Sequence, residues 1–186
     1  MKIDKNVRQG AAFACVAVLL AGCTSVTDIN RMWGADNDKL RSDVCRKELP
    51  LTKRAAVVAL VETFGQLNLL VENTDPELGL VRATGKAPAP LSYDEFEQVK
   101  KVEGPRIKNP FFSWNMQFDI ALSGVVNERA GGGSLTALTG RLDFEGNKQM
   151  VEPVSELPPL ALKLACEKIF ARLEKTASEQ QRTLAQ

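Results

Sequence analysis

Four cationic side chains fall within nine residues, directly before a group of aromatic side chains. Cations beside aromatic rings can bind anionic headgroups, lipopolysaccharide or peptidoglycan, or form the energetic centre of a protein interface. A solvated loop followed by aromatic residues of the core has the same pattern, and both interpretations stand at this point. The candidate residues for binding a partner or an anionic surface are Lys100, Lys101, Arg106, Lys108, Phe111, Phe112 and Trp114.

Two further motifs have the residue types of a binding site. The run 131–133 is Gly-Gly-Gly, but no Lys-Ser or Lys-Thr follows it as in a phosphate loop, so a hairpin tip is favoured. Asp94, Glu95 and Glu97 carry carboxylates that suit a cation. They lie at the start of an expected helix, where acidic groups are stabilised by the helix dipole, so a solvated face is favoured. We therefore predict no metal site.

The chain contains no histidine. A Ser-His-Asp triad, a Cys-His pair, an HExxH zinc site and a Cys2His2 finger are excluded, because each needs this residue. No arrangement of Asp, Glu, Lys or Ser forms a catalytic constellation, so we expect no enzyme, no catalytic residue and no cofactor. Lys and Arg number 24 against 23 Asp and Glu, and this balance gives no field that would attract nucleic acid.

The N-terminus has the features of a secretory signal. Residues 1–9 hold three basic side chains and one acidic one, and residues 10–22 hold no charge. The apolar run 11–20 is too short to span a bilayer. It ends in Leu20-Ala21-Gly22-Cys23, which resembles the lipobox of bacterial lipoproteins. The resemblance implies a signal peptide over 1–22, diacylglyceryl on the Cys23 thiol, and an acyl chain such as palmitate on its amine.

Acyl chains on Cys23 would be the membrane anchor, because two or three chains hold a protein stably whereas one is marginal. Cleavage removes three basic side chains and one acidic one, leaving 164 residues with 21 basic and 22 acidic side chains. The protein is therefore expected to be held by lipid rather than by a basic patch. Thr24, rather than Asp, follows Cys23. By resemblance to enterobacterial sorting rules, this favours the outer membrane over retention in the inner membrane. We expect the protein on the periplasmic side of the outer membrane.

Cys45 and Cys166 remain after processing, because Cys15 leaves with the signal peptide and Cys23 is lipidated. In an oxidising envelope such a pair is a disulfide candidate. The bond would close a loop of about 120 residues. Two separate buried thiols are the alternative. A catalytic thiol is not favoured, because the chain has no CxxC motif and no histidine.

The first half of the processed chain predicts a tether, a helix and a hairpin. Residues 23–48 are expected to hold the lipidated Cys and a polar tether, with at most one short helix after residue 34. Residues 51–65 have a helical apolar stripe, with Thr52 as its cap. Residues 66–84 alternate on either side of an Asp-Pro…Gly turn, which predicts a β-hairpin.

The second half predicts an insertion, a second hairpin and a final helix. The insertion 85–110 is irregular except for a short helix at 93–101, which opens with a capping-box pattern. Alternating apolar residues in 114–122 and 135–145 predict the second hairpin. The final helix is expected at about 160–180, opened by two prolines. A polar tail is expected over 177–186.

These elements predict a single α+β domain over 49–176. Its antiparallel sheet has about four strands in two hairpins, and two main helices pack on one face. The helix, the strand and the D-x-x-x-G turn formed by Asp75, Leu78, Gly79 and the following Val81 resemble small helix-grip-like periplasmic lipoprotein domains. One such domain type occurs in a lipoprotein of the outer-membrane β-barrel assembly machinery. The resemblance implies the fold type and the envelope location.

Together these features predict a non-enzymatic lipoprotein of the bacterial envelope, an outer-membrane scaffold or accessory subunit that binds protein partners. The alternative is a module that holds a lipid or small apolar ligand between the sheet and the final helix; a glycan ligand also fits the cationic cluster. Partner binding predicts an exposed apolar or aromatic patch, for example at 111–114. Ligand binding predicts a closed apolar pocket of about 300 Å³ or more.

Overall fold

The computed structural model of the protein describes residues 25–108, 113–114, 117–144 and 154–184. Over these residues the chain is α+β, with a five-stranded antiparallel sheet and four α-helices. The strands lie in the order β1-β5-β4-β3-β2. The elements are α2 (Val26–Asp43), β1 (Arg46–Leu49), α3 (Lys53–Gln66), β2 (Leu70–Asp75), β3 (Leu80–Lys86), α4 (Tyr93–Glu103), the 3-10 turn η1 (Gly104–Arg106), β4 (Phe118–Glu128), β5 (Ser134–Phe144) and α5 (Pro159–Leu184).

Both hairpins expected from the alternating apolar residues are confirmed. β2 pairs with β3 and β4 pairs with β5, and the pairing of β3 with β4 joins the two hairpins. The glycines at 131–133 form the tip of the second hairpin, with φ angles of 98°, 99° and 80°. These angles lie in the left-handed region that glycine adopts without a steric penalty. The hairpin interpretation of this glycine run is therefore confirmed.

The fifth strand, β1, was not among the expected strands. It pairs antiparallel with β5, from Arg46 opposite Ala137 to Leu49 opposite Ser134. Its sequence Arg-Lys-Glu-Leu has one apolar residue and no alternation, so no local pattern indicates a strand. β1 forms because β5 offers unpaired backbone groups along its edge, and the disulfide described below holds the segment beside it.

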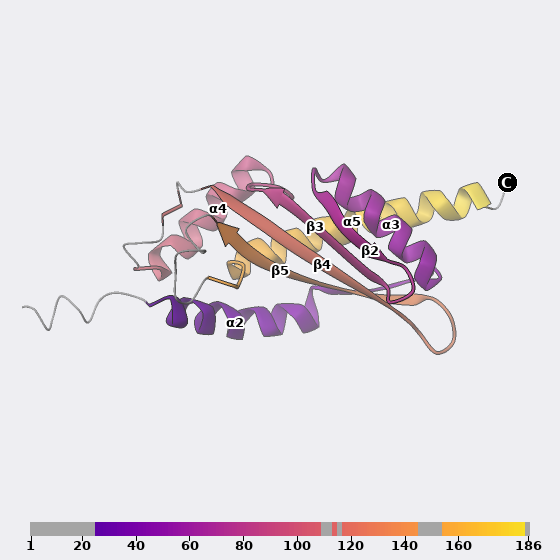
Figure 1. The fold of residues 1–186 in the computed structure, drawn as a ribbon, viewed down its shortest axis with the longest axis horizontal. Helices are drawn as coiled ribbons and strands as arrows, with labels where there is room; N and C mark the ends of the chain where they lie inside the picture. Colours follow the sequence, from indigo (N-terminus) through magenta and orange to yellow (C-terminus); the bar gives the residue numbers. More distant parts are fainter. Residues whose placement is uncertain (1–24, 109–112, 115–116, 145–153, 185–186) are drawn as a thin grey trace, which may run out of the picture.

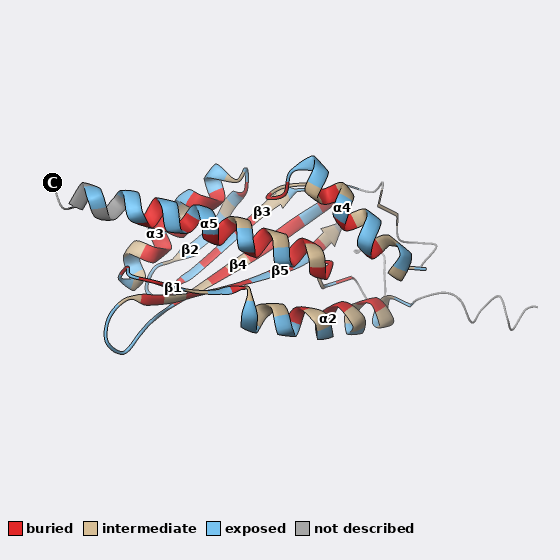
Figure 2. Ribbon diagram, turned by 180° about the vertical axis from the view of Figure 1, so that it is seen from behind, coloured by how far each residue is buried: buried red, intermediate tan, exposed pale blue. Residues whose placement is uncertain are grey.

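One face of the sheet is covered by helices and the other is open. Figure 2 shows α5 running across the covered face, with buried positions alternating along the strands beneath it. On β4 the inward side chains are Phe118, Ile120 and Leu122, and all three are buried. α3 packs beside α5, α4 packs against α5, and α2 contacts β1, β5 and α5. In Figure 1 no described helix crosses in front of the opposite face.

Two glycines allow the helical layer to lie close to the sheet. A Cβ atom at Gly124 would overlap the side chain of Leu60 on α3. A Cβ atom at Gly140 would overlap the side chain of Leu157, which precedes α5. The missing side chains leave room for these two leucines, which are fully buried. The space between the sheet and the helices is therefore filled by close packing of side chains.

The expectation of a polar tether over 23–48 is wrong for most of that segment, because α2 occupies Val26–Asp43 and β1 follows it. Ser25 caps the helix, and its capping box with Asp28 is complete. Ile29 and Trp33 are fully buried against the domain. Asn37, one turn further along, is also fully buried, and its amide nitrogen donates to Glu156 Oε2 and to the Leu157 carbonyl, both at 2.9 Å. One of the three buried positions on this face is therefore polar. A search for apolar residues at helical spacing does not count it, so the sequence pattern did not predict the helix.

The disulfide between Cys45 and Cys166 is present, and it joins the residue that precedes β1 to α5. The Cα atoms of the two cysteines are 5.2 Å apart, and both residues are buried. The alternative of two separate thiols is thus excluded. The bond closes nearly the whole domain into one loop, because its cysteines are 121 positions apart.

The two helices expected in the second half are confirmed, and the last one extends further than expected. In α4 the Ser92 hydroxyl accepts from the Glu95 N–H, and the Glu95 carboxylate accepts from the Ser92 N–H at 2.6 Å. α5 continues to Leu184, where a polar tail was expected from 177. Ala177 is still buried, and Lys175 and Glu179 form an i,i+4 pair, so packing and local charge both extend the helix.

Candidate functional site

Arg106, the centre of the predicted cationic cluster, forms ion pairs within the domain. Its guanidinium donates to Asp36 Oδ2 at 2.6 Å and to Glu103 Oε2 at 2.9 Å. The hydrogen bond to Asp36 is the main cause that raises the pKa of Arg106. Glu103 is buried, and its second oxygen accepts from the Leu160 N–H at 3.3 Å. Arg106 therefore joins η1 to α2, and through Glu103 to the start of α5.

Of the other described members of the cluster, two pack against neighbouring side chains and two are exposed. Lys100 donates to Glu97 Oε1 at 2.6 Å and lies over the Phe96 ring, 4.9 Å from its centroid. Trp114 is half-buried and meets Phe96 edge-on, with ring centroids 6.2 Å apart. Lys101 and Lys108 are exposed, whereas Phe111 and Phe112 lie outside the described residues. Two of the four cations, Lys100 and Arg106, are thus paired within the domain, and the other two are exposed.

Two of the three acidic residues at the start of α4, Glu95 and Glu97, have structural partners, and Asp94 is exposed. Glu95 Oε2 accepts from Lys168 Nζ on α5 at 2.7 Å, in addition to its capping bond. The hydrogen bond from Lys168, followed by the one from the Ser92 backbone, lowers the pKa of Glu95. Glu97 pairs with Lys100, as described above. These carboxylates cap α4 and join it to α5, and within the described residues no cluster of three or more metal-binding side chains occurs.

The open face of the sheet presents residues that the sequence analysis did not single out. Leu80 of β3 lies opposite Val125 of β4, and Val125 lies opposite Ala137 of β5. Their strand neighbours Val81, Gly124 and Leu138 are buried on the covered face, so these three side chains belong to the open face. Leu80 is 41% exposed, and the other two are half-buried. We call Leu80, Val125 and Ala137 the apolar row.

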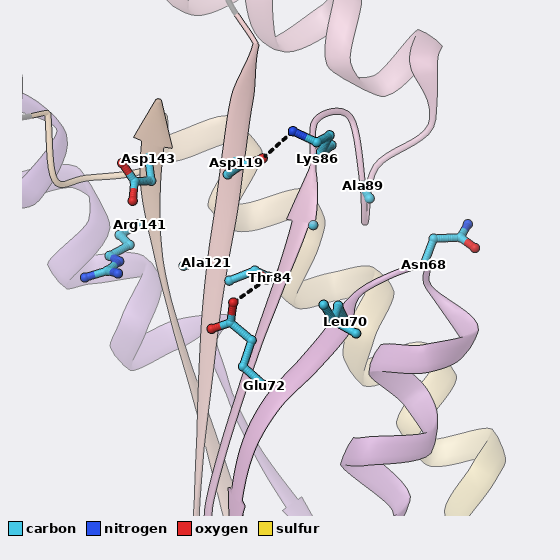
Figure 3. Close-up of a pocket in the computed structure, with 11 residues that line it drawn as sticks. Asn68, Leu70, Glu72, Thr84, Lys86, Ala89, Asp119, Ala121, Arg141 and Asp143 are labelled. Atoms are coloured by element: carbon cyan, nitrogen blue, oxygen red, sulfur yellow. Dashed lines mark hydrogen bonds and ion pairs between the residues drawn. The ribbon is translucent and has the colours of Figure 1, made fainter. Parts of the chain in front are cut away.

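A pocket of about 660 Å³ lies on the same face, further along β2–β5 toward the turn after β3. Figure 3 shows its charged lining, with Lys86 directed at Asp119 and Thr84 at Glu72. The Thr84 hydroxyl donates to Glu72 Oε1 at 2.8 Å, and the Lys86 and Asp119 charges are 3.5 Å apart. Leu70, 70% exposed, is a large apolar side chain in the lining.

Charges on this face are not fully matched across the strands. Asp119 lies directly opposite Asp143 on β5, and like charges in this position are unfavourable. Lys86 lies opposite Asp119 on the other side and offsets part of the repulsion. Arg141, the next outward residue on β5, also lines the pocket. The open face thus combines a row of three apolar side chains with a patch of both signs further along the same strands.

The alternative ligand site, between the sheet and the final helix, is occupied by side chains. Leu122 and Leu138 of the sheet and Leu162 of α5 are at most 1% exposed. The pocket on the open face has a charged lining and is open to solvent, unlike the closed apolar pocket expected for a lipid. The sequence does contain a signal for this face. Leu135 and Ala137 alternate in step with Thr139 and Arg141 along β5, so these apolar residues point to the same open side as the polar ones.

Comparison with known proteins leaves the chain unassigned: no protein family matches it, and no curated protein matches it significantly. Among the described residues, no helix is both long enough and apolar enough to cross a membrane. The function proposed below therefore depends on the N-terminal motif and on the surface of the domain.

Proposed function

We propose that this protein is a non-enzymatic lipoprotein of the bacterial cell envelope, anchored by acyl chains on Cys23. We propose further that it lies on the periplasmic side of the outer membrane and serves as a scaffold or accessory subunit. Its domain binds a protein partner through the open face of the sheet. The anchor is inferred from the motif Leu20-Ala21-Gly22-Cys23, and the disulfide between Cys45 and Cys166 is consistent with an oxidising compartment.

The observation that carries the partner-binding part is the open face. An antiparallel sheet needs only one covered face, so exposure by itself is ordinary. The distinctive feature is the composition of the exposed surface, where the apolar row and a charged patch lie on the same face. Protein interfaces combine apolar and charged groups in this way, with the apolar ones at their centre. A partner with basic groups would also offset the Asp119–Asp143 repulsion.

Ligand binding is the second candidate, and the pocket on the open face is the observation that favours it. Its lining includes Glu72, Lys86 and Arg141, so a polar ligand such as a glycan fits it better than an acyl chain does. An apolar ligand between sheet and α5 has less support, because that space is filled.

The anchor predicts a clear effect of Cys23→Ser. The variant is expected to fold normally and to leave the membrane fraction, because residue 23 precedes the N-cap of α2 in the chain and its thiol would carry the first acyl chains. Fractionation of cells would measure the location, and mass spectrometry of the wild-type N-terminal peptide would measure the acylation. A Cys23→Ser protein that stays in the membrane would contradict the proposed anchor. Cys15→Ser is the matched control and should change neither result.

The open face predicts a loss of partner binding in Leu80→Lys. Leu80 is 41% exposed in the apolar row, and a lysine there would place a charge that the partner must desolvate. Val58→Lys is the matched control, because Val58 is 47% exposed on α3, away from this face. Each tagged protein would be extracted in mild detergent, and its co-purifying proteins would be quantified by mass spectrometry.

The expected result is stoichiometric envelope proteins with the wild type and with Val58→Lys, and a loss of about tenfold or more with Leu80→Lys, corresponding to about 1.4 kcal/mol. Equal recovery with both variants would contradict the role of the open face. A wild-type protein that purifies alone with a bound small molecule would favour the ligand-binding alternative.

A further inference from the structure

The folded domain begins almost immediately after the proposed lipidation site. Ser25 is the N-cap of α2, two residues after Cys23. Its hydroxyl accepts from the Asp28 N–H at 3.1 Å and donates to Asp28 Oδ2 at 2.7 Å. The hydrogen bond from the Ser25 hydroxyl is the main cause that lowers the pKa of Asp28. A complete capping box thus holds the first turn of the helix.

α2 is fixed to the rest of the domain from this first turn onward. Ile29 and Trp33 are fully buried, so the helix cannot swing away without exposing them. Asn30 Oδ1 accepts from the Ser155 N–H at 3.0 Å, a contact between segments 125 positions apart. Arg41 pairs with Glu156 at 2.6 Å near the other end of the helix. The helix therefore moves with the domain as one body.

The length of chain between lipid and domain is then a strict limit on distance. Two residues span at most about 7 Å when fully extended. Ser25 would therefore stay within that distance of a membrane-anchored Cys23. The polar tether expected over residues 23–48 would have allowed a separation of tens of ångströms.

The start of α2 lies at one extremity of the long axis of the molecule. Figure 1 shows α2 entering at the end where α4 also lies, whereas the C-terminal end of α5 lies at the opposite end, with the β4–β5 hairpin tip toward the same side. α5 has 26 residues, which correspond to about 39 Å of helix. The two ends of the domain are thus separated by a distance larger than the anchor allows.

We propose that the end of the domain containing the first turn of α2 and Ser155 lies against the lipid headgroups, while the β4–β5 tip and the end of α5 point away from the bilayer. This inference rests on the proposed acylation of Cys23. The surface is suited to headgroups rather than to hydrocarbon, because Ser25, Thr27, Arg31 and Ser155 are exposed polar residues there. The open face of the sheet then stands sideways to the membrane, within reach of a periplasmic partner.

Energy transfer to labelled lipids tests this orientation. The full lipidated protein, carrying either Arg31→Cys or Ala130→Cys, would be labelled with a donor dye and reconstituted into vesicles of phosphatidylethanolamine and phosphatidylglycerol with acceptor-labelled headgroups. Both positions are exposed, and the native disulfide is buried. We expect transfer to be several-fold stronger from residue 31 than from residue 130. Equal transfer, or stronger transfer from residue 130, would overturn the orientation.

A linker variant serves as the control. Twelve Gly and Ser residues inserted between Thr24 and Ser25 leave the motif up to Thr24 intact and give a flexible segment with a typical span of about 20 Å. Transfer from residue 31 should fall, and it should approach the value for residue 130. Transfer that stays unchanged would overturn the claim that the short connection sets the orientation. Intact mass and vesicle flotation separate the two proposals: a protein without acyl chains defeats both, whereas an acylated protein with equal transfer defeats the orientation alone.

Discussion

Reduction of the Cys45–Cys166 disulfide is expected to lower the free energy of unfolding by about 4–5 kcal/mol, in the chain-entropy model for a loop of this length. The bond joins residues 121 positions apart, so its removal frees nearly the whole domain in the unfolded state. For a domain of this size the loss corresponds to a fall of about 10–20 °C in Tm. Denaturant titration with and without dithiothreitol would measure it, on the chain from residue 23 carrying Cys23→Ser.

The double variant Cys45→Ala, Cys166→Ala is the control for this experiment. It should show the low stability from the outset and should not respond to dithiothreitol. A difference below about 1 kcal/mol between oxidised and reduced wild type would mean that the bond contributes little to this fold, since native disulfides of small secreted domains typically contribute 2–5 kcal/mol.

Trp33→Ala is expected to destabilise the domain by about 3–5 kcal/mol, the usual cost of removing a large buried aromatic side chain. Trp33 is fully buried where α2 meets the rest of the domain. A Trp in a tether would cost almost nothing to replace. The experiment therefore measures whether α2 belongs to the folded body, on which the inferred membrane orientation also depends. Equilibrium unfolding followed by circular dichroism gives the value.

Arg31→Ala is the matched control on the same helix. Arg31 is exposed, and its guanidinium pairs with Asp28 one turn earlier on the same helix. The loss of an exposed pair of this kind should change stability by about 0.5 kcal/mol or less. If Trp33→Ala were as mild as Arg31→Ala, α2 would be loosely attached. The domain would then be able to turn on its anchor.

Local patterns in the sequence were sufficient wherever the stabilising contacts are local. The two hairpins follow from alternation and turn residues, and α4 follows from the capping box of Ser92 with Glu95. The disulfide candidate followed from the count of cysteines that would remain after the expected processing. Each of these depends on residues that are close in sequence or on a choice with few alternatives.

The elements that the sequence analysis missed depend on distant partners. β1 has no strand pattern of its own and forms by pairing with β5, about 90 positions later. α2 has a fully buried polar residue, Asn37, whose amide nitrogen donates to Glu156 and to the Leu157 carbonyl. A local count of apolar residues takes this position as exposed. In both cases the hydrogen-bond partner comes from the other end of the chain, and no window of ten to twenty residues contains it.

The surroundings of the candidate binding residues also depend on segments that are distant in the sequence. Four cations in nine residues suggested one charged surface. In the structure Arg106 pairs with Asp36, while Lys100 pairs with Glu97 and lies over the Phe96 ring. Charge spacing along the chain cannot reveal a partner 70 positions away, as Asp36 is from Arg106. The apolar row is the converse case. Its three residues come from three strands and become neighbours only when the strands align.

By itself, then, the sequence determined the elements with local periodicity, the likeness of the N-terminus to a lipobox and the exclusion of histidine chemistry. These depend on residue type and on short spacing, which folding does not alter. The tertiary structure alone decided that the supposed tether is a packed helix, that the sheet has a fifth strand, and which face of the sheet is left open. Those outcomes depend on burial and pairing between distant segments, because a side chain or backbone group is stabilised by what surrounds it in space rather than along the chain.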